Sequence, residues 1–336
     1  MDFLNALIAL ANFVLVPGIA YASQLALGAL GITLIYGILR FSNFAHGDTM
    51  AFGAMVVILV TWWMQSVGIS IAPLPTALLA LPFGIAASAA LLLVTDRFVY
   101  RFYRRQKAAP IIMVMASLGV MFIMNGLVRF IIGPGDQQFA DGARFILKAR
   151  DFKAATGLAE GLTIKVSQGI TLVVAVVVVA ALFWFLNKTR TGKSMRAFSD
   201  NEDLALLSGI NPERVVTIVW LLVAVLITVG GTLYGLDKSF KPFTFFQLLL
   251  PMFAAAIVGG LGNPVGAIAG GVVIAFSEIS VTYAFKKVLG YLVPDGFEPT
   301  TLVQLLSTDY KFAVSFSILV LVLLFRPTGL FKGQSV

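Results

Sequence analysis

Residues 170–186 read ITLVVAVVVVAALFWFL and contain no charged side chain and no polar stripe at a helical period. An α-helix needs about 20 apolar residues to cross the hydrocarbon core of a membrane. A strand of a membrane barrel would instead alternate apolar with polar residues, which this stretch does not do. Because backbone groups cannot stay unpaired in lipid, these residues predict a membrane-spanning α-helix.

The rest of the chain has the same character. Its mean hydropathy is +0.95, and only 12% of its 336 residues are charged, against about 25% in ordinary soluble domains. With the stretch at 168–187, roughly ten apolar segments can be recognised, the others lying near 3–16, 19–39, 49–66, 73–96, 111–132, 214–236, 246–261, 264–285 and 311–325. We therefore expect an all-α fold, a polytopic transmembrane helical bundle in which residues 1–336 form a single transmembrane domain.

The composition also excludes several kinds of site. The chain has no cysteine and one histidine, His46, so disulfides and the usual metal clusters are not expected. A membrane enzyme is not favoured, because no cluster of histidines or acids is available for catalysis. The net charge of +8 is typical of basic cytoplasmic loops, not of nucleic-acid binding. We expect the protein to contact membrane lipid, and we expect neither a nucleic-acid partner nor a cofactor.

A possible nucleotide-binding motif can be set aside. Residues 192–194 read GKS, like the end of a phosphate-binding loop, but they follow an apolar span instead of a strand. The position of the first glycine of that motif is occupied by Asn187. The chain is therefore not expected to bind ATP itself.

The basic loops predict an orientation, because lysine and arginine concentrate on the cytoplasmic side of membrane proteins. Three clusters follow apolar segments, namely Arg97, Arg101, Arg104, Arg105 and Lys107, then Lys188, Arg190, Lys193 and Arg196, then Arg326 and Lys332. With alternating crossings all three fall on one side, the cytoplasm, and both termini are expected there too. The segments 133–167 and 286–310 then face outside, either as solvated loops or as docking surfaces for an external partner.

One polar segment between two spans, SMRAFSDNEDLALLSGINPE at 194–213, has the signals of a short capped helix. Asp200 is a suitable N-cap, with Asp203 at the spacing of a capping box. Gly209 suits the position after the last helical residue. Asn211 then caps the next helix. Leucines 204, 206 and 207 add an apolar patch, so the segment is either an interfacial helix that completes a loop or a docking site for a soluble partner.

A polar break, NFAHGD at 43–48, interrupts two apolar runs. Such residues are costly between membrane segments unless they are buried in protein or line water. The glycine permits an unwound backbone, and Asp48 can cap the following helix. The break is either a tight cytoplasmic turn or part of a translocation pathway, whose residues would be Asn43, Phe44, His46, Gly47 and Asp48.

A second break, GGLGNPVG at 259–266, lies in the other half of the chain, as a duplicated transporter fold would place it. Glycines 262, 266 and 270 recur at every fourth position, which allows another helix to approach closely. The glycines and Pro264 indicate a bend or a re-entrant turn. Packing explains the glycine face better than substrate contact. The remaining candidates for the pathway are Gly259, Gly260, Gly262 and the intramembrane acid Glu278.

Five segments carry a resemblance to a known family. They are LGALGITLIYGILRFSNFAHGD (27–48), FVYRFYRRQKAAP (98–110), TRTGKSMRAFSDNEDLALLSGINPERV (189–215), AAAIVGGLGNPVGAIAGGVVIAFSE (254–278) and STDYKFAVSFSILVLVLLFRPTGL (307–330). Together they resemble the permease subunits of Liv-type, branched-chain amino acid ABC importers, and the H-type subunit in particular. The resemblance covers most of the chain.

This resemblance implies a type II-like ABC importer permease in the bacterial inner membrane, without enzymatic chemistry of its own. Its partners would be two ATP-binding cassette subunits, a second homologous permease subunit and a periplasmic substrate-binding protein. Residues 188–213 would be the cytoplasmic coupling loop, and 133–167 and 286–310 periplasmic loops. The residues expected to meet the ATPase are Arg196, Asp200, Asp203, Leu204, Leu207 and Gly209.

Two departures from the family leave the substrate open. Members often carry a lysine just before the AAA/GG segment, where this chain has Leu250-Pro251-Met252, and a tyrosine where it has Gln24-Leu25-Ala26-Leu27. Besides branched-chain or related amino acids, related permeases resemble importers of urea, short amides or aromatic acids. A stand-alone secondary transporter is the alternative from another class, with Asp48 and Glu278 as ion-coupling candidates. It leaves the capped helix near residue 204 unexplained.

Overall fold

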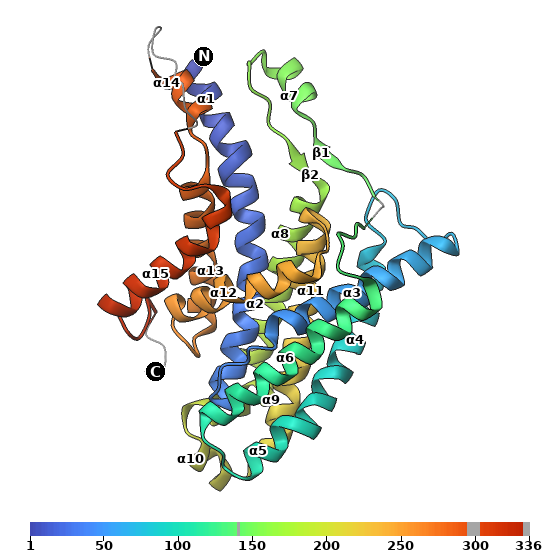
Figure 1. The fold of residues 1–336 in the computed structure, drawn as a ribbon, viewed down its shortest axis with the longest axis vertical. Helices are drawn as coiled ribbons and strands as arrows, with labels where there is room; N and C mark the ends of the chain where they lie inside the picture. Colours follow the sequence, from blue (N-terminus) through green and yellow to red (C-terminus); the bar gives the residue numbers. More distant parts are fainter. Residues whose placement is uncertain (140–141, 294–302, 332–336) are drawn as a thin grey trace.

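The computed structural model describes residues 1–139, 142–293 and 303–331, which are mostly helical (Figure 1). Within them, nine helical segments are long and apolar enough to cross a membrane, which confirms the all-α transmembrane bundle. The spans are built from α1 (Asp2–Leu10), η1 (Ala11–Leu15), α2 (Val16–Leu39), α3 (His46–Ser66), α4 (Ala77–Thr95), η2 (Asp96–Tyr100), α5 (Arg101–Arg105), α6 (Pro110–Ile132), α8 (Val166–Lys188), α11 (Pro212–Lys238), α12 (Pro242–Gly259), α13 (Pro264–Thr282), η3 (Thr308–Tyr310) and α15 (Lys311–Phe325). The connections contain β1 (Phe145–Leu147), α7 (Ala149–Thr156), β2 (Ile164–Lys165), α9 (Arg190–Asp200), α10 (Glu202–Leu207) and α14 (Lys286–Leu292).

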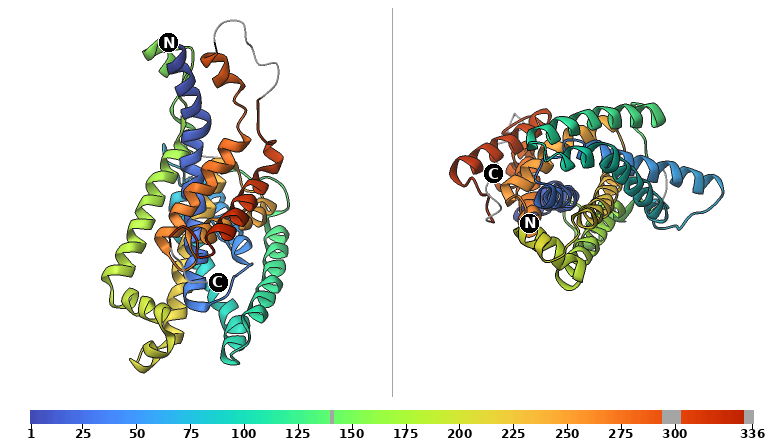
Figure 2. Two further views of the ribbon diagram at one scale, coloured as in Figure 1. Left: turned by 90° about the vertical axis from the view of Figure 1, so that its left-hand side faces the viewer. Right: turned by 90° about the horizontal axis from the view of Figure 1, so that it is seen from below.

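The first two apolar segments, 3–16 and 19–39, form one helix of 38 residues instead of two spans. The π-helical turn η1 joins α1 to α2, and the N–H of Val16 bonds to the carbonyl of Ala11, five residues back. Such a turn keeps the helix continuous up to Pro17, which lies in the first turn of α2. Met1 consequently lies at the end of the bundle that carries α7 and α14, opposite α5 and α10 (Figures 1 and 2). The N-terminus does not share a side with the basic loop at 97–107, contrary to expectation.

Helix α2 lies at the centre of the bundle, as the view from below in Figure 2 shows. It packs against α8, α11, α12 and α13, and 18 of its 24 residues are buried. Glycines make these close contacts possible. A Cβ on Gly28 would overlap the sulfur of Met252, and one on Gly31 would lie 2.6 Å from the imidazole of His46. The other spans are therefore arranged around a helix with little contact with lipid.

The helices α12 and α13 form a tight hairpin at the second break. A Cβ on Gly266 would lie 2.3 Å from the carbonyl oxygen of Gly259, and one on Gly270 only 2.0 Å from that of Ala255. Between the helices, Gly260 and Gly262 adopt positive φ angles of 112° and 83°. These contacts confirm that the glycine face is a packing surface.

The end of the bundle that carries α7 and α14 is joined by hydrogen bonds around Glu160. Its carboxylate accepts from Lys287 Nζ at 2.8 Å and from the Tyr291 hydroxyl at 2.6 Å, and its N–H donates to Asn5 at 3.2 Å. Burial raises the pKa of Glu160, but these two donors and the Lys287 charge outweigh it, so that the pKa is lowered. The segments predicted as outer loops, 133–167 and 286–310, contribute this cluster. Parts of both (residues 140–141 and 294–302) lie outside the described residues, as does Lys332.

Candidate functional site

The polar segment between α8 and α11 forms two short helices at one end of the bundle (Figure 1). Helix α9 starts after Thr189, whose hydroxyl accepts from the N–H of Gly192 at 3.0 Å. The N-cap of α10 is Asn201, which accepts from the N–H of Leu204 at 3.0 Å, and not Asp200 as the sequence suggested. The reason is that Asp200 is the last residue of α9, whereas a cap needs the extended backbone that Asn201 has at φ −153°.

Helix α10 presents apolar side chains to solvent. Leu207 is 85% exposed and Leu204 is 61% exposed, while Ala205 is buried against the protein. The helix ends at Leu207, and Gly209, two residues later, has the predicted left-handed φ of 78°. All residues predicted to contact a soluble partner are exposed: Arg196, Asp200, Asp203, Leu204, Leu207 and Gly209. The arrangement is that of a small protruding surface with an apolar centre and charged neighbours.

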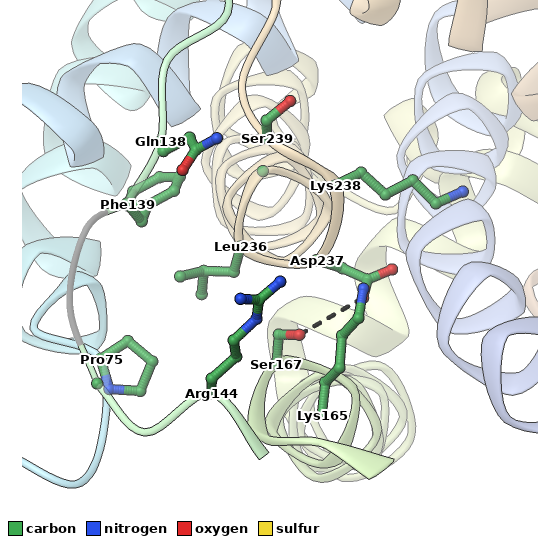
Figure 3. Close-up of a pocket in the computed structure, with 12 residues that line it drawn as sticks. Pro75, Gln138, Phe139, Arg144, Lys165, Ser167, Leu236, Asp237, Lys238 and Ser239 are labelled. Atoms are coloured by element: carbon green, nitrogen blue, oxygen red, sulfur yellow. Dashed lines mark hydrogen bonds and ion pairs between the residues drawn. The ribbon is translucent and has the colours of Figure 1, made fainter. Parts of the chain in front are cut away.

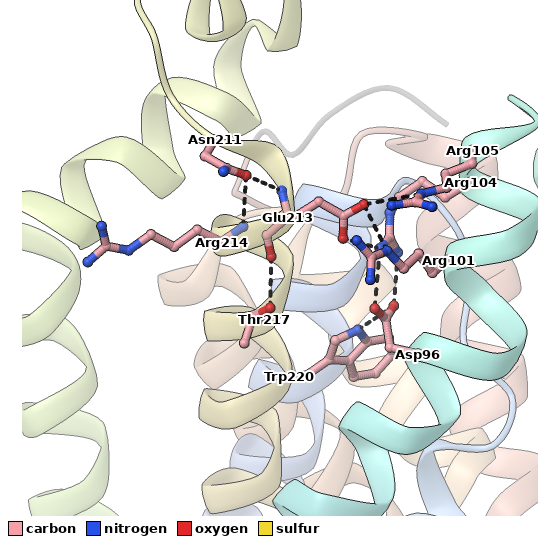
Figure 4. A network of polar contacts seen from close by, with 9 residues as sticks. All are labelled: Asp96, Arg101, Arg104, Arg105, Asn211, Glu213, Arg214, Thr217 and Trp220. Atoms are coloured by element: carbon pink, nitrogen blue, oxygen red, sulfur yellow. Dashed lines mark hydrogen bonds and ion pairs between the residues drawn. The ribbon is translucent and has the colours of Figure 1, made fainter.

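A cluster of arginines and acids lies beside this segment (Figure 4), and the sequence reasoning did not single it out as a site. Glu213, in the first turn of α11, accepts from Arg101 Nε at 3.1 Å and from Arg104 Nη2 at 3.5 Å. Arg104 also forms a two-pronged pair with Asp96 at 2.9 and 3.2 Å. The signal that could have revealed part of the cluster was Asp96 next to a run of arginines, which we used only for orientation, whereas no local pattern links this run to Glu213.

The break before α3 lies inside the bundle. Helix α2 ends at Leu39, with Arg40 as its C-cap, and α3 begins at His46. His46 is fully buried, and its Nε2 lies 3.0 Å from the carbonyl oxygen of Gly28. Gly28 is twelve residues before Arg40, so His46 lies about 18 Å from that end of α2, at 1.5 Å per residue. His46 therefore lies well inside the bundle and not at its end.

Two polar side chains of this break keep unpaired atoms in the interior. Asp48, 1% exposed, accepts from Asn125 of α6 at 2.6 Å, but its second oxygen has no partner, and neither does Nδ1 of His46. Gly47 is needed for packing, because a Cβ there would lie 2.5 Å from the carbonyl oxygen of Phe245 on α12. Phe44 packs on Phe253 with the ring centres 5.3 Å apart. The break thus combines close helix contact with unsatisfied buried polar groups.

The remaining candidates lie at other levels along α2. Glu278, 1% exposed, accepts from the Tyr21 hydroxyl at 2.9 Å and from Ser315, whereas the turn around Gly262 lies next to Gly37. Tyr21 and Gly37 are 16 positions apart on one helix, with Gly28 between them, which corresponds to about 24 Å. The structure therefore does not bring Glu278, Gly259, Gly260 and Gly262 into one site with residues 43–48. In the described residues no group of three or more histidines, cysteines or acids could hold a metal ion.

A polar cavity of about 490 Å³ opens at the other end of α11 (Figure 3), and the sequence analysis did not anticipate it. Its lining includes Arg144, Lys165 and Asp237, with the Arg144 side chain pointing toward the end of α11. The Asp237 side chain is 4% exposed, lies 3.8 Å from Lys165 Nζ and accepts from Ser167 at 3.4 Å. This cavity carries more positive than negative groups and suits a polar or anionic group better than an apolar one.

Comparisons with known proteins agree over nearly the whole chain. The family model described as branched-chain amino acid transport system / permease component matches residues 14–323. The high-affinity branched-chain amino acid transport system permease protein LivH of Salmonella typhimurium is 29% identical, over 95% of this chain and 94% of its own. BraD of Pseudomonas aeruginosa, named as a permease of the same system, is 27% identical over 96% of both chains.

More distant similarity extends to sugar transport. The galactose/methyl galactoside import permease protein MglC of Haemophilus influenzae is 22% identical over 77% of this chain and 75% of its own. No solved structure gives a significant match. Because the family model covers residues 14–323, the chain belongs to the family of branched-chain amino acid transport system permease components.

Proposed function

We propose that this chain is the membrane-spanning subunit of an ATP-driven importer, that α9 and α10 dock onto its ATP-hydrolysing subunits, and that a soluble binding protein delivers substrate to the end that carries α7 and α14. The observation that carries the proposal is the exposed apolar surface of α10, a capped helix between two spans, in a chain of this permease family. This orientation makes the α10 end cytoplasmic and places Met1 outside.

The surface chemistry of α10 supports this docking role. Burying a leucine side chain stabilises by about 1.5–3 kcal/mol relative to leaving it exposed, so Leu204 and Leu207 favour a partner with an apolar groove. The acids Glu202 and Asp203 lie at the start of the same helix. They would pair with basic groups at the rim of such a groove and fix the orientation of the helix.

We propose further that a second permease subunit completes the pathway and that nucleotide binding alternates the access of the two sides. The buried break at Asn43–Asp48 supports a place for substrate passage, because polar atoms at membrane depth are costly unless a function retains them. A secondary transporter would need ionisable groups along the pathway. Among the described spans the buried acids are Asp48, Asp96 and Glu278. Asp96 is paired with Arg104, and Asp48 and Glu278 lie near different levels of α2.

The substrate class is taken from the relatives. LivH and BraD are named as branched-chain amino acid permeases and cover nearly all of this chain, whereas the galactose permease is more distant. We therefore propose branched-chain or related amino acids as substrates. Urea, short amides and aromatic acids are the alternatives.

The test is a purification of the tagged chain from its native membrane in mild detergent, with mass spectrometry of the proteins that accompany it. We expect ATP-binding subunits and a second permease, and a binding protein whose ligand can then be identified by titration with amino acids, urea, short amides and aromatic acids. A chain that purifies alone and transports when reconstituted alone would contradict the proposal.

A further inference from the structure

The first turn of α11 is held by α5. Glu213 lies two residues after Asn211, whose side chain caps α11, and six residues after the end of α10. Its carboxylate faces three guanidinium groups of one short helix, at 3.1 Å (Arg101), 3.5 Å (Arg104) and 3.8 Å (Arg105). Any displacement of α10 that moves the start of α11 must therefore also move α5 or break these pairs.

A second contact lies on the same side of α11, two turns further along. Trp220 Nε1 donates to Asp96 Oδ1 at 2.9 Å, and Arg104 holds the same carboxylate with both of its terminal nitrogens. Trp220 follows Glu213 by seven residues, so the two attachment points are about 10 Å apart along the helix. Attachment at two levels resists both sliding and rotation. The segment Asp96–Arg105 and the first half of α11 thus behave as one unit.

This unit reaches the buried break through Tyr100 (Figure 4 shows the arginine end of the chain of contacts). The Tyr100 ring stacks on Trp220 with centres 5.5 Å apart and planes 12° from parallel. Its hydroxyl donates to Asn43 Oδ1 at 3.1 Å, and the same oxygen accepts from the N–H of Ala45 at 3.1 Å. Tyr100 and Trp220 are each at most 1% exposed. The tyrosine hydroxyl therefore helps to fix the backbone that leads directly into His46.

Asp96 and Tyr100 are the first and last residues of the π-helical turn η2. Single π turns inside helices recur at functional sites, because they re-aim side chains that a regular helix would point elsewhere. Here the turn directs Asp96 and Tyr100 toward the same tryptophan. The π turn η2 therefore connects the ion pairs at Asp96 with the contacts of Tyr100.

We infer that the contacts from Glu213 through Arg104, Asp96, Trp220 and Tyr100 to Asn43 transmit movement of α10 to the buried break, with Tyr100 as a positioning residue. The inference rests on the proposed docking of α10. Packed interfaces of this kind switch between discrete arrangements instead of deforming continuously. A static packing role for the same residues would stabilise the fold without making the break respond to nucleotide.

The absence of cysteine from the chain allows a direct reporter of the break. Ser117 is fully buried and accepts from the N–H of Phe44 at 3.1 Å. The near-isosteric replacement Ser117→Cys places a thiol against the break. Its labelling rate would be measured with a maleimide in the purified complex, without nucleotide and after trapping with ATP and vanadate.

Three variants are compared in the Ser117→Cys background. Tyr100→Phe keeps the stacked ring and removes the hydroxyl, and Glu213→Gln keeps the size of the side chain and removes the charge. The matched control is Arg214→Gln, because Arg214 lies next to Glu213 but points away from the cluster (Figure 4). All variants are first checked for co-purification of the ATP-hydrolysing subunits and for vanadate trapping.

We expect trapping to change the labelling rate about fivefold or more, the lower end of typical coupling between sites. This change should be seen both in the background chain and in Arg214→Gln. Tyr100→Phe and Glu213→Gln should assemble and trap but lose most of this change. The double variant should lose no more than either single variant, because both interrupt the same chain of contacts.

Two results would overturn the inference while the proposed function stands. One is an unchanged labelling response in Tyr100→Phe, and the other is no response in a background complex that assembles and traps. If the unaltered chain binds no ATP-hydrolysing subunit, the proposed function fails, and this inference fails with it before any labelling is done.

Discussion

Replacing Gly270 by alanine tests whether the α12–α13 hairpin depends on direct backbone contact. The added Cβ would lie 2.0 Å from the carbonyl oxygen of Ala255 and 2.9 Å from the nitrogen of Gly259. A carbon and a carbonyl oxygen approach to about 3.3 Å at closest in proteins. The two helices would have to separate by about 1.3 Å along this line, and the obstacle is backbone, which cannot rotate away.

The expected cost follows from this geometry. Overpacking of a well-packed core typically costs about 1–3 kcal/mol and sometimes more. Because α13 is also packed against α2 through Gly271, whose Cβ would lie 3.0 Å from the backbone of Ala26, it cannot simply shift outward. We expect a loss of about 3 kcal/mol, a shift of roughly 150-fold in the folding equilibrium.

The assay is unfolding of the detergent-solubilised chain with increasing SDS, followed by circular dichroism. The matched control is Gly126→Ala on α6, where no heavy atom lies within 4 Å of the added Cβ. It should be neutral or stabilise by up to about 1 kcal/mol, the difference in helix propensity between the two residues. If Gly270→Ala unfolds at the same SDS fraction as Gly126→Ala, the close contact described here is not part of the native packing.

Three further changes give distinct outcomes. Leu207→Asp should abolish uptake and co-purification of ATP-hydrolysing subunits, measured by transport and mass spectrometry, and leave the unfolding midpoint unchanged because the side chain is 85% exposed; a lower midpoint would mean that Leu207 packs inside the chain. Because the pKa of Glu160 is lowered in the folded state, its ionised carboxylate stabilises the fold above the ordinary pKa of glutamate. This stabilisation is lost as the pH falls through the folded-state pKa. The free energy of unfolding, measured by thermal melts between about pH 6 and pH 3, should therefore decline less steeply with falling pH in Glu160→Gln than in the unaltered chain. The difference should be at most about 1 kcal/mol, since Lys287 is half exposed. Parallel curves for the two proteins would contradict this expectation. Glu278→Leu should cost about 1–3 kcal/mol because the Tyr21 hydroxyl loses its acceptor, and the companion Tyr21→Phe in the same background should restore part of it; no recovery in the SDS titration would show that the bond is not the cause.

The sequence was sufficient for the fold class and for much of the local capping. Long charge-free runs such as 170–186 require helices in lipid, and Asn211 and Gly209 occupy the cap positions that were predicted for them. These signals are local. They depend on a few neighbouring residues and not on how the spans pack.

The errors came from features that depend on neighbouring helices. The apolar segments 3–16 and 19–39 were counted separately, but the π turn and burial against α13 carry one helix through Pro17 and Gly18. Asp200 has a side chain suited to an N-cap, but it is the last residue of α9 and therefore has a helical backbone. The depth of His46 is set by its contact with Gly28 of α2, which no local pattern encodes.

The helix that runs from Asp2 to Leu39 has a mechanical consequence. Its 38 residues correspond to a rod of about 57 Å, nearly twice the hydrocarbon thickness of about 30 Å. The rod is packed against α8, α11, α12 and α13 along α2, while its first turns contact α14 and the segment at Glu160. A lever multiplies displacement in proportion to the length of its free arm. A slight tilt of α2 in the bundle therefore produces its largest displacement near Met1, and that displacement is passed to α14 and to the segment at Glu160, which contact the first turns.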